Sequence, residues 1–413
     1  MIKRFTSKNG LRIVFEPNNT VRSVSIGIWI GTGSRFETKE ENGVSHFLEH
    51  MFFKGTKSRT AQQIAESFDS IGGQVNAFTS KEYTCYYAKV LDNHARHAVD
   101  VLADMYFHST FDKAELAKEK SVVLEEIKMY EDTPDDIVHD LLSRASFGDH
   151  PLGYPILGTE ETLAKFSPES LFDYMEQYYH ADNVVISICG NVDESFVAYV
   201  DEVFSPMKPG SQSGTLLKPM FNSDRIAKKK ETEQAHLCIG FEGFPLRNEQ
   251  IYSLVLLNNT LGGSMSSRLF QEVREKRGLA YSVYSYHSAF HDTGMLTVYA
   301  GTAQDHLDKL YEILMNTIEK VRLDGLTERE LANGKEQLKG SLMLGLESTN
   351  SRMSRNGKNE LLLGRHRTLD EMIESIDSVT LDMVHKTSEA IFSKEFSLTL
   401  ISPQGKLPMG VVQ

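Results

Sequence analysis

Two β-rich stretches decide the fold: Val24-Ser25-Ile26-Gly27-Ile28-Trp29-Ile30 in the first half of the chain and His236-Leu237-Cys238-Ile239-Gly240-Phe241 in the second. In each half the stretch is followed by a helical segment, a glycine turn, further strands and two helices. The second of these helices carries Glu-Leu-Ala, at residues 115–117 and again at 330–332. The repeated order predicts an α+β chain of two homologous α/β units. Because the strands alternate in polarity, each unit is expected to form a largely antiparallel sheet with helices packed on one face.

A linker is indicated between the two halves. Residues 205–214 read Ser-Pro-Met-Lys-Pro-Gly-Ser-Gln-Ser-Gly, a stretch that is rich in turn-forming residues and poor in large apolar ones. We therefore predict an N-terminal domain over residues 1–208, a linker over 209–224 and a C-terminal domain over 225–413. A length of 413 residues suits such a division.

The composition is that of a soluble globular protein, with 40% apolar and 24% charged residues. The chain has 44 basic and 57 acidic residues, and the resulting net charge of −13 argues against a nucleic-acid partner. No apolar run approaches the roughly 20 residues of a membrane span, and no secretory signal is visible. The cysteines Cys85, Cys189 and Cys238 are few and widely spaced, which fits a reducing compartment. We therefore expect a cytoplasmic protein without a membrane or nucleic-acid partner.

The motif His46-Phe47-Leu48-Glu49-His50 is the strongest candidate for chemistry. It lies in an apolar segment, residues 44–53, that is typical of a buried helix. His46 and His50 are one helical turn apart, so both rings leave the same face and can hold one metal ion. Glu49 points to nearly the same side, where it can act as the general base toward a water molecule. The alternative is a pair of core histidines with a locally hydrogen-bonded carboxylate, because H-x-x-E-H arises by chance in roughly a few per cent of such chains.

A catalytic zinc needs a third protein ligand, and the best source is the helix expected from about Asp112 to Asp132. Glu126 borders the apolar face of this helix, with apolar residues one turn before and one turn after it. Glu125 falls instead among lysines and a serine on a solvated face. Glu119 shares the stripe of Glu126 but lies roughly 10 Å along the axis, so the two are not expected to reach one ion. We assign Glu126 as the ligand and expect Glu119 to orient a ligating histidine, the alternative for either being a surface glutamate.

These residues resemble the pitrilysin/insulinase-type zinc metallopeptidases, also called inverzincins, and especially their small bacterial branch similar to the mitochondrial processing peptidase. The histidine motif is followed, 76 residues after His50, by Glu126 within Val123-Leu124-Glu125-Glu126-Ile127. The likeness covers almost the whole chain. Further matching segments are residues 73–80 (Gly-Gln-Val-Asn-Ala-Phe-Thr-Ser), 150–153 (His-Pro-Leu-Gly) and 269–281 (Leu-Phe-Gln-Glu-Val-Arg-Glu-Lys-Arg-Gly-Leu-Ala-Tyr).

The resemblance implies a zinc-dependent endopeptidase that holds one Zn²⁺ per chain. His46, His50 and Glu126 would bind the zinc, and Glu49 would activate the attacking water. The implied reaction is hydrolysis of a peptide bond in peptides or unfolded polypeptides.

The resemblance also implies where the substrate is held. Asn76 and Ala77 would lie on an edge strand that pairs with the extended substrate, a mode that gives affinity through main-chain hydrogen bonds. Arg274 and Tyr281 match the pair that contacts substrate carbonyls, and a guanidinium with a phenol suits a developing oxyanion. Without the resemblance, Arg274 would be interpreted as a helix-surface charge and Tyr281 as a half-buried strand residue.

The second half contains no H-x-x-E-H motif. An approximate alignment of the two halves places Leu254, Leu257 and Asn258 opposite the residues of that motif, and Ser341 opposite Glu126. The C-terminal domain is therefore expected to contact substrate without binding metal.

Larger members of the resembled family have four such units in one chain, whereas this chain has two. A homodimer would rebuild four units around a closed chamber, and Arg274 and Tyr281 would then act on the zinc site of the partner subunit. Two alternatives stay open. One is a processing peptidase dedicated to a few proteins, and the other is a non-catalytic or partner-dependent subunit of a peptidase complex.

Overall fold

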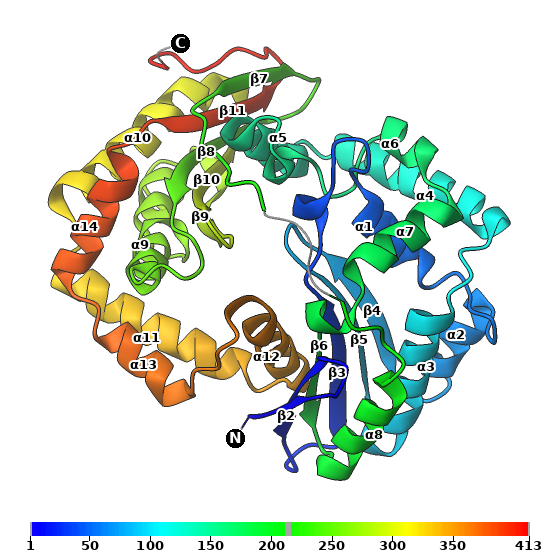
Figure 1. Cartoon of the computed structure of the whole chain (residues 1–413). Helices are drawn as coiled ribbons and strands as arrows, with labels where there is room; N and C mark the ends of the chain where they lie inside the picture. The colour runs from blue at the N-terminus through cyan, green and yellow to red at the C-terminus, as the bar shows by residue number, and fades with distance from the viewer. Residues whose placement is uncertain (1, 211–215, 412–413) are drawn as a thin grey trace. The chain divides into compact units, whose positions relative to one another are not determined.

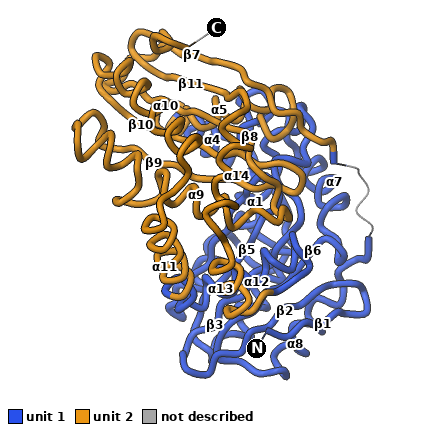
Figure 2. The backbone as a smooth tube through the Cα atoms, turned by 90° about the vertical axis from the view of Figure 1, so that its left-hand side faces the viewer, with its two compact units in different colours: residues 1–128, 154–216, 344–366 blue, residues 129–153, 217–343, 367–413 orange. Residues whose placement is uncertain are grey.

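The computed structural model describes residues 2–210 and 216–411, and Figure 1 labels its helices and strands. The chain divides into two compact units, which Figure 2 shows in different colours. Unit 1 contains residues 1–128, 154–216 and 344–366. Unit 2 contains residues 129–153, 217–343 and 367–413. Each unit therefore takes segments from both halves of the chain.

Unit 1 is built on a six-stranded sheet in the order β1-β2-β6-β3-β5-β4. The strands are β1 (Lys3–Thr6), β2 (Arg12–Pro17), β3 (Ser23–Ile30), β4 (Gln74–Thr79), β5 (Thr84–Leu91) and β6 (Val184–Gly190). The β2–β6 pair is parallel and the other neighbouring pairs are antiparallel. Alternation along β3 directs Ile26 and Ile28 into one apolar cluster and Trp29 into another on the opposite face.

The larger apolar cluster of unit 1 lies between the sheet and a set of helices from the first half of the chain. These helices are α1 (Val44–Met51), α2 (Ala61–Asp69), α3 (Ala95–His108), α4 (Lys113–Glu131), α6 (Glu160–Lys165), α7 (Pro168–Tyr178) and α8 (Glu194–Phe204). Short 3₁₀ turns lie at Ser34–Phe36, Asp92–His94 and Ala181–Asn183.

The Trp29 face of the same sheet is covered by α12 (Thr349–Leu363), a helix from the second half of the chain that lies beside β3 and β6 in Figure 1. The indole Nε1 of Trp29 donates a hydrogen bond to Met353 Sδ at 3.4 Å, and Ser187 Oγ donates to the Met353 carbonyl at 2.7 Å. Arg4 Nη2 lies 2.7 Å from Oε1 of Glu360, whose side chain is almost fully buried. Both apolar packing and ion pairing therefore fix α12 on unit 1.

The five-stranded sheet of unit 2, in the order β7-β11-β8-β10-β9, repeats the β2-β6-β3-β5-β4 part of the sheet of unit 1. The strands are β7 (Arg225–Lys229), β8 (Ala235–Gly243), β9 (Ala280–Ala289), β10 (Gly294–Thr302) and β11 (Phe396–Ser402). The β7–β11 pair is parallel and the others are antiparallel, as for β2–β6 and its neighbours. The expected pair of homologous, largely antiparallel units is therefore confirmed.

Helices also lie on both faces of the second sheet. One face carries α9 (Ile251–Gly262), α10 (Leu307–Asp324), α11 (Glu328–Gly345), α14 (Leu381–Phe392) and the π-helical turn η5 (Phe270–Glu275). Helix α13 (Leu369–Asp377) is joined to α11 by hydrogen bonds from Lys335 and Lys339 to Asp377. The other face carries α5 (Pro134–Phe147), a helix from the first half of the chain, followed by a 3₁₀ turn at Pro151–Gly153. The predicted layer of helices is thus present, and in each unit one helix from the other half covers the second face.

This exchange explains why the compact units do not follow the predicted domains 1–208 and 225–413 residue by residue. Helix α5 belongs to the first half and packs in unit 2, while α12 belongs to the second half and packs in unit 1. Of the predicted linker 209–224, residues 211–215 lie outside the described residues. Just before it, Met207 is buried in the core of unit 1. Among the described residues, no helix is long and apolar enough to cross a membrane.

Candidate metal centre

Helix α1 presents the histidine motif, and the chain in front of it explains where the helix begins. Gly43 has φ +96°, and a Cβ there would lie 2.7 Å from the Gly158 Cα, so only glycine fits. The buried carboxylate of Glu37 accepts hydrogen bonds from the backbone N–H groups of Gly43 (2.7 Å) and Ser45 (2.9 Å). These bonds satisfy donors at the start of α1 that have no partner within the helix. The first turn of α1 is therefore held from outside, immediately before His46.

Helix α4 supplies the two glutamates. It begins after Asp112, whose Oδ1 accepts from the N–H groups of residues 114 and 115, and it ends at Glu131, before Pro134. Glu119 is buried with 3% of its surface exposed. Glu126 lies two turns later and is half-buried, whereas the Glu125 side chain is exposed and pairs with a lysine. The expected helix 112–132 and the expected exposure of Glu125 both agree with this structure.

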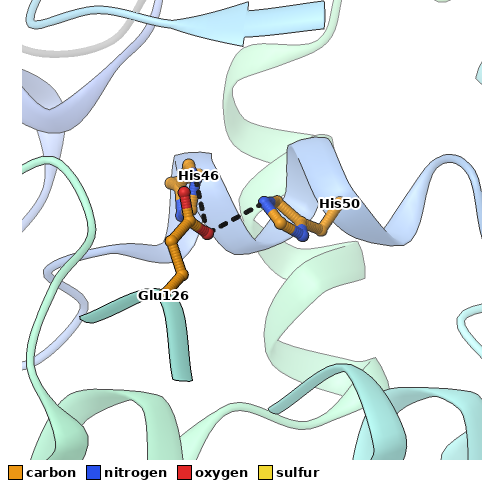
Figure 3. A group of neighbouring side chains, drawn as sticks. All are labelled: His46, His50 and Glu126. Atoms are coloured by element: carbon orange, nitrogen blue, oxygen red, sulfur yellow. Dashed lines mark ion pairs between the residues drawn. The ribbon is translucent and has the colours of Figure 1, made fainter. Parts of the chain in front are cut away.

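The three predicted ligands come together in unit 1. Oε2 of Glu126 lies 3.8 Å from Nε2 of His46 and 3.5 Å from Nε2 of His50 (Figure 3). The two imidazole rings are 4.6 Å apart between centroids. One donor atom from each of the three residues lies within 4.8 Å of the others, and the described residues contain no second group of this kind. Two rings from one helix face and one carboxylate from another helix thus converge on a common point.

Glu119 stands behind this group. Its Oε1 lies 2.8 Å from Nδ1 of His50, the ring nitrogen opposite the one that faces Glu126. Its Oε2 lies 2.6 Å from the Nζ of Lys54. A carboxylate on Nδ1 fixes the imidazole tautomer that leaves the Nε2 lone pair free for a ligand. Glu119 is therefore placed to orient His50 and too far along α4 to share the ligand position of Glu126.

Glu49 lies between the two histidines in sequence and turns toward the sheet. Its Oε2 accepts a hydrogen bond from the Thr79 hydroxyl at the end of β4. Strand β4, which also carries Asn76 and Ala77, is an edge strand of the six-stranded sheet. The geometry therefore connects the proposed general base to the strand that was expected to bind substrate.

Burial and neighbouring charges shift the pKa values of these groups in different directions. Burial, with the nearby His50, lowers the pKa of His46 to about 3, so this ring is neutral at neutral pH. Burial alone would lower the pKa of His50, but Glu119, Glu126 and Glu49 outweigh it and raise it. Burial raises the pKa of Glu49, and the hydrogen bond from Thr79 reduces this shift. A neutral His46 and a basic carboxylate beside it are what ligation and proton abstraction require.

The donor set fits a zinc ion. Zinc in hydrolytic sites is commonly held by two imidazole nitrogens and one carboxylate oxygen, which leaves a position open for water or substrate. His46, His50 and Glu126 provide such a set, and Glu126 remains partly exposed, with 35% of its side chain accessible. The carboxylates of Glu49 and Glu119 add negative charge that favours a divalent cation.

Arg274 and Tyr281 lie side by side in unit 2. Arg274 lies in the last turn of the π-helical element η5, and its guanidinium carbon lies 4.4 Å from the centroid of the Tyr281 ring. Arg274 Nη1 also donates to the Tyr281 carbonyl at 3.2 Å. Tyr281 is on the edge strand β9 and is 75% exposed, so it is not the half-buried strand residue that its sequence context suggested. The guanidinium thus orders an exposed phenol on a sheet edge.

Sequence reasoning missed three residues that support the site: Glu37, Lys54 and Thr79. Lys54 follows His50 by one helical turn, a spacing that could have pointed to it. Thr79 lies in a segment that matches the family, but its partner Glu49 is 30 residues away in sequence. Glu37 is only six and eight residues from its partners Gly43 and Ser45. Of the two apolar residues one turn before Glu126, Val123 is buried as expected, but Val122 is 51% exposed and does not join the apolar face.

Comparison with known proteins places the chain among metallopeptidases. Residues 12–160 match the family model described as insulinase (peptidase family M16), and residues 165–338 match the one described as peptidase M16 inactive domain. An uncharacterized zinc protease of Bacillus subtilis, YmxG, is 63% identical over 99% of this chain and 100% of its own length. An uncharacterized zinc protease of Streptomyces coelicolor is 41% identical over 97% of this chain and 90% of its own.

Solved structures share the fold. A peptidase M16 inactive domain from Pseudomonas fluorescens superposes with a TM-score of 0.92 at 19% identity, covering 100% of both chains. A protease from Helicobacter pylori superposes with a TM-score of 0.91 at 20% identity, covering 98% of this chain and 99% of its own. At this identity the likeness concerns the arrangement of helices and strands.

Proposed function

Since the chain belongs to peptidase family M16, the insulinase family, we propose that it is a zinc-dependent endopeptidase that cleaves peptides or unfolded polypeptides. The observation that carries the proposal is the convergence of His46, His50 and Glu126 with Glu49 beside them. The zinc-protease names of the similar proteins agree with it. We further propose one zinc ion per chain, held by these two imidazoles and one carboxylate.

A zinc ion bound there would supply Lewis acidity, which polarises a peptide carbonyl and makes water more acidic. Glu49 takes a proton from the attacking water and returns it to the leaving amine. Thr79 holds one oxygen of Glu49 and so fixes the direction in which the carboxylate faces. Glu119 keeps the proton of His50 on Nδ1. The chain's own groups thus carry the proton and orient the ligands.

Substrate binding is assigned to two sheet edges. The extended peptide adds as a strand to β4 at Asn76 and Ala77, with main-chain bonds that demand little of its sequence. Arg274 and Tyr281 stabilise negative charge on the substrate carbonyl. Arg274 stacks on the Tyr281 ring and donates a hydrogen bond to the Tyr281 carbonyl, so the two residues are held together before substrate binds.

The active species in this proposal is a homodimer that encloses a chamber, in which Arg274 and Tyr281 of one subunit serve the zinc site of the other. A chamber would admit short or unfolded chains and exclude folded proteins. We place the enzyme in the cytoplasm, which its three buried free thiols support. Mixed dimers of a Glu49→Gln subunit with a Tyr281→Phe subunit test action across the dimer. Recovery of activity is expected, and no recovery in demonstrated mixed dimers would contradict it.

The test of the activity itself is cleavage of a quenched basic peptide by the purified full chain. Cleavage should disappear on chelation and return when zinc is added back. A second candidate is a non-catalytic or partner-dependent subunit, which the description of residues 165–338 as an inactive domain favours. Wild-type protein that binds zinc but cleaves no member of a mixed peptide library would support that candidate.

A further inference from the structure

Lys54 lies just beyond the end of helix α1. The backbone continues to turn after Met51, because Phe53 N donates to the His50 carbonyl and Lys54 N donates to the Met51 carbonyl, each at 3.1 Å. Lys54 is therefore one helical turn after His50, on the same side of the helix. Gly55, with φ +121°, then leads the chain away. The local backbone thus directs the Lys54 side chain toward the residue that His50 contacts.

The contact is with Glu119, and it completes a bridge. Oε1 of Glu119 lies 2.8 Å from His50 Nδ1, and Oε2 lies 2.6 Å from Lys54 Nζ. The Glu119 side chain is 5% exposed and that of Lys54 is 30% exposed. Among the described residues, His50 and Lys54 are the only basic groups within ion-pair distance of Glu119. Each carboxylate oxygen of this buried glutamate is therefore held by a different partner.

Holding both oxygens restricts rotation of the carboxylate. With Lys54 removed, Glu119 would keep one strong partner, and its carboxylate could turn about the bond that joins it to the chain. The His50 ring would then lose the fixed acceptor of its Nδ1 proton, and the direction in which its Nε2 faces Glu126 would vary more. Partners behind a metal ligand commonly change metal affinity by 10- to 100-fold when they are removed.

The charges around the site agree with such a role. The ionised carboxylates of Glu49, Glu119 and Glu126 together with the ammonium of Lys54 carry a formal charge of −2. A divalent cation cancels that charge, and the histidines are neutral ligands. Lys54 thus balances the charge of Glu119, while the carboxylates of Glu49 and Glu126 keep their attraction for the cation.

We propose that Lys54 is a positioning residue for the metal centre, which holds Glu119 so that Glu119 can orient His50. This inference rests on the proposed zinc site. It predicts that zinc affinity falls when Lys54 is removed, whereas simple electrostatics predicts that it rises. If Lys54 were only a positive charge near a cation, its removal would strengthen zinc binding, because like charges repel. If Lys54 positions Glu119, its removal weakens zinc binding.

The experiment measures zinc affinity of the full chain by competition with a chromophoric chelator, without any activity assay. Lys54→Met should weaken binding by about tenfold or more, and Lys54→Arg, which keeps a charged donor, should restore it to within about threefold. Lys128→Met is the matched control, because it removes an exposed lysine that pairs with Glu125 on α4. It should leave the affinity unchanged.

A double-substitution cycle tests the route through Glu119. In a Glu119→Gln background, Lys54→Met should change the affinity by less than about twofold, since its partner is already gone. Circular dichroism of the metal-free proteins checks folding, and Lys54→Gln replaces Lys54→Met should the latter fail to fold. Unchanged or tighter zinc binding by the Lys54 variants would overturn the inference. Wild-type protein that binds no zinc would instead overturn the proposed function beneath it.

Discussion

Replacing Gly357 by alanine should destabilise unit 1, because this glycine lies against the indole of Trp29. Gly357 is in α12, the helix that comes from the second half of the chain and covers the first sheet. A Cβ at this position would lie 2.5 Å from Cδ1 and 2.6 Å from Cε2 of Trp29. Carbon atoms in contact normally stay about 3.5–4.0 Å apart. Either the helix or the indole must therefore move.

The expected size of the effect combines two opposing contributions. Overpacking a filled core costs about 1–3 kcal/mol. Trp29 is 1% exposed and hydrogen-bonded to Met353, so its indole has little room to move. The cost of overpacking should therefore lie in the upper part of this range. Alanine is a better helix former than glycine by about 1 kcal/mol, which offsets part of the cost. The net loss should be about 2 kcal/mol, or a melting temperature lower by about 4–8 °C for a unit of this size.

Gly340→Ala is the matched control. Gly340 is also inside a helix, α11, but a Cβ there meets no atom within 4 Å. The same chemical change should therefore stabilise the protein, by up to about 1 kcal/mol. Thermal unfolding followed by circular dichroism compares the two variants. Because Trp29 is the one tryptophan of the chain, its fluorescence reports on the altered contact directly. Equal stabilisation by both substitutions, with unchanged Trp29 emission, would refute the packing of α12 on the first sheet.

Three further predictions concern single residues. Gly43→Ala should lower the free energy of unfolding by about 2 kcal/mol or more, because Gly43 precedes helix α1 with a positive φ and has backbone atoms too close for a Cβ. It should also weaken zinc binding, and thermal melts and zinc titration measure the two effects. Burial lowers the pKa of His139 from 6.5 to about 4, so the unfolded chain takes up this proton first. The free energy of unfolding should fall by about 3 kcal/mol between about pH 6.5 and 4, and His139→Gln should flatten that fall in urea titrations. Arg268 lowers the pKa of Glu330 from 4.5 to about 2, which adds stability that is complete above about pH 4.5 and is lost toward pH 2. Arg268→Met should remove about 1–2 kcal/mol at neutral pH, a size limited by the partial exposure of both side chains. The loss should be smaller at pH 2, where Glu330 is partly protonated.

The fold could be predicted where local signals are strong. The helix expected at 112–132 is α4, because Asp112 caps its start and Pro134 follows its end. The doubled order of strands and helices likewise predicted the two sheets. The exchange of α5 and α12 could not be predicted in this way. The contact of Trp29 with Met353 joins residues more than 300 positions apart, and a local pattern cannot say which sheet an apolar helix face will meet.

The candidate site divides in a similar way. The i, i+4 spacing brings His46 and His50 together on any α-helix, so this pair could be predicted from the sequence. Glu126 was predicted from its place on α4 and from the family resemblance. Lys54 was not predicted, because a lysine after an apolar helix is typical of a solvated surface. Only the position of Glu119, buried behind His50, gives that lysine a specific partner.

The most direct test of the account compares wild-type protein with Glu49→Gln in two assays on the same preparation. Mass spectrometry gives the zinc content of each chain, and a quenched basic peptide reports cleavage. We predict about one zinc per chain in both proteins, with cleavage only by the wild type, because the proposal gives proton transfer to Glu49 and metal binding to His46, His50 and Glu126. Absence of zinc from both proteins, or equal cleavage by both, would contradict the account.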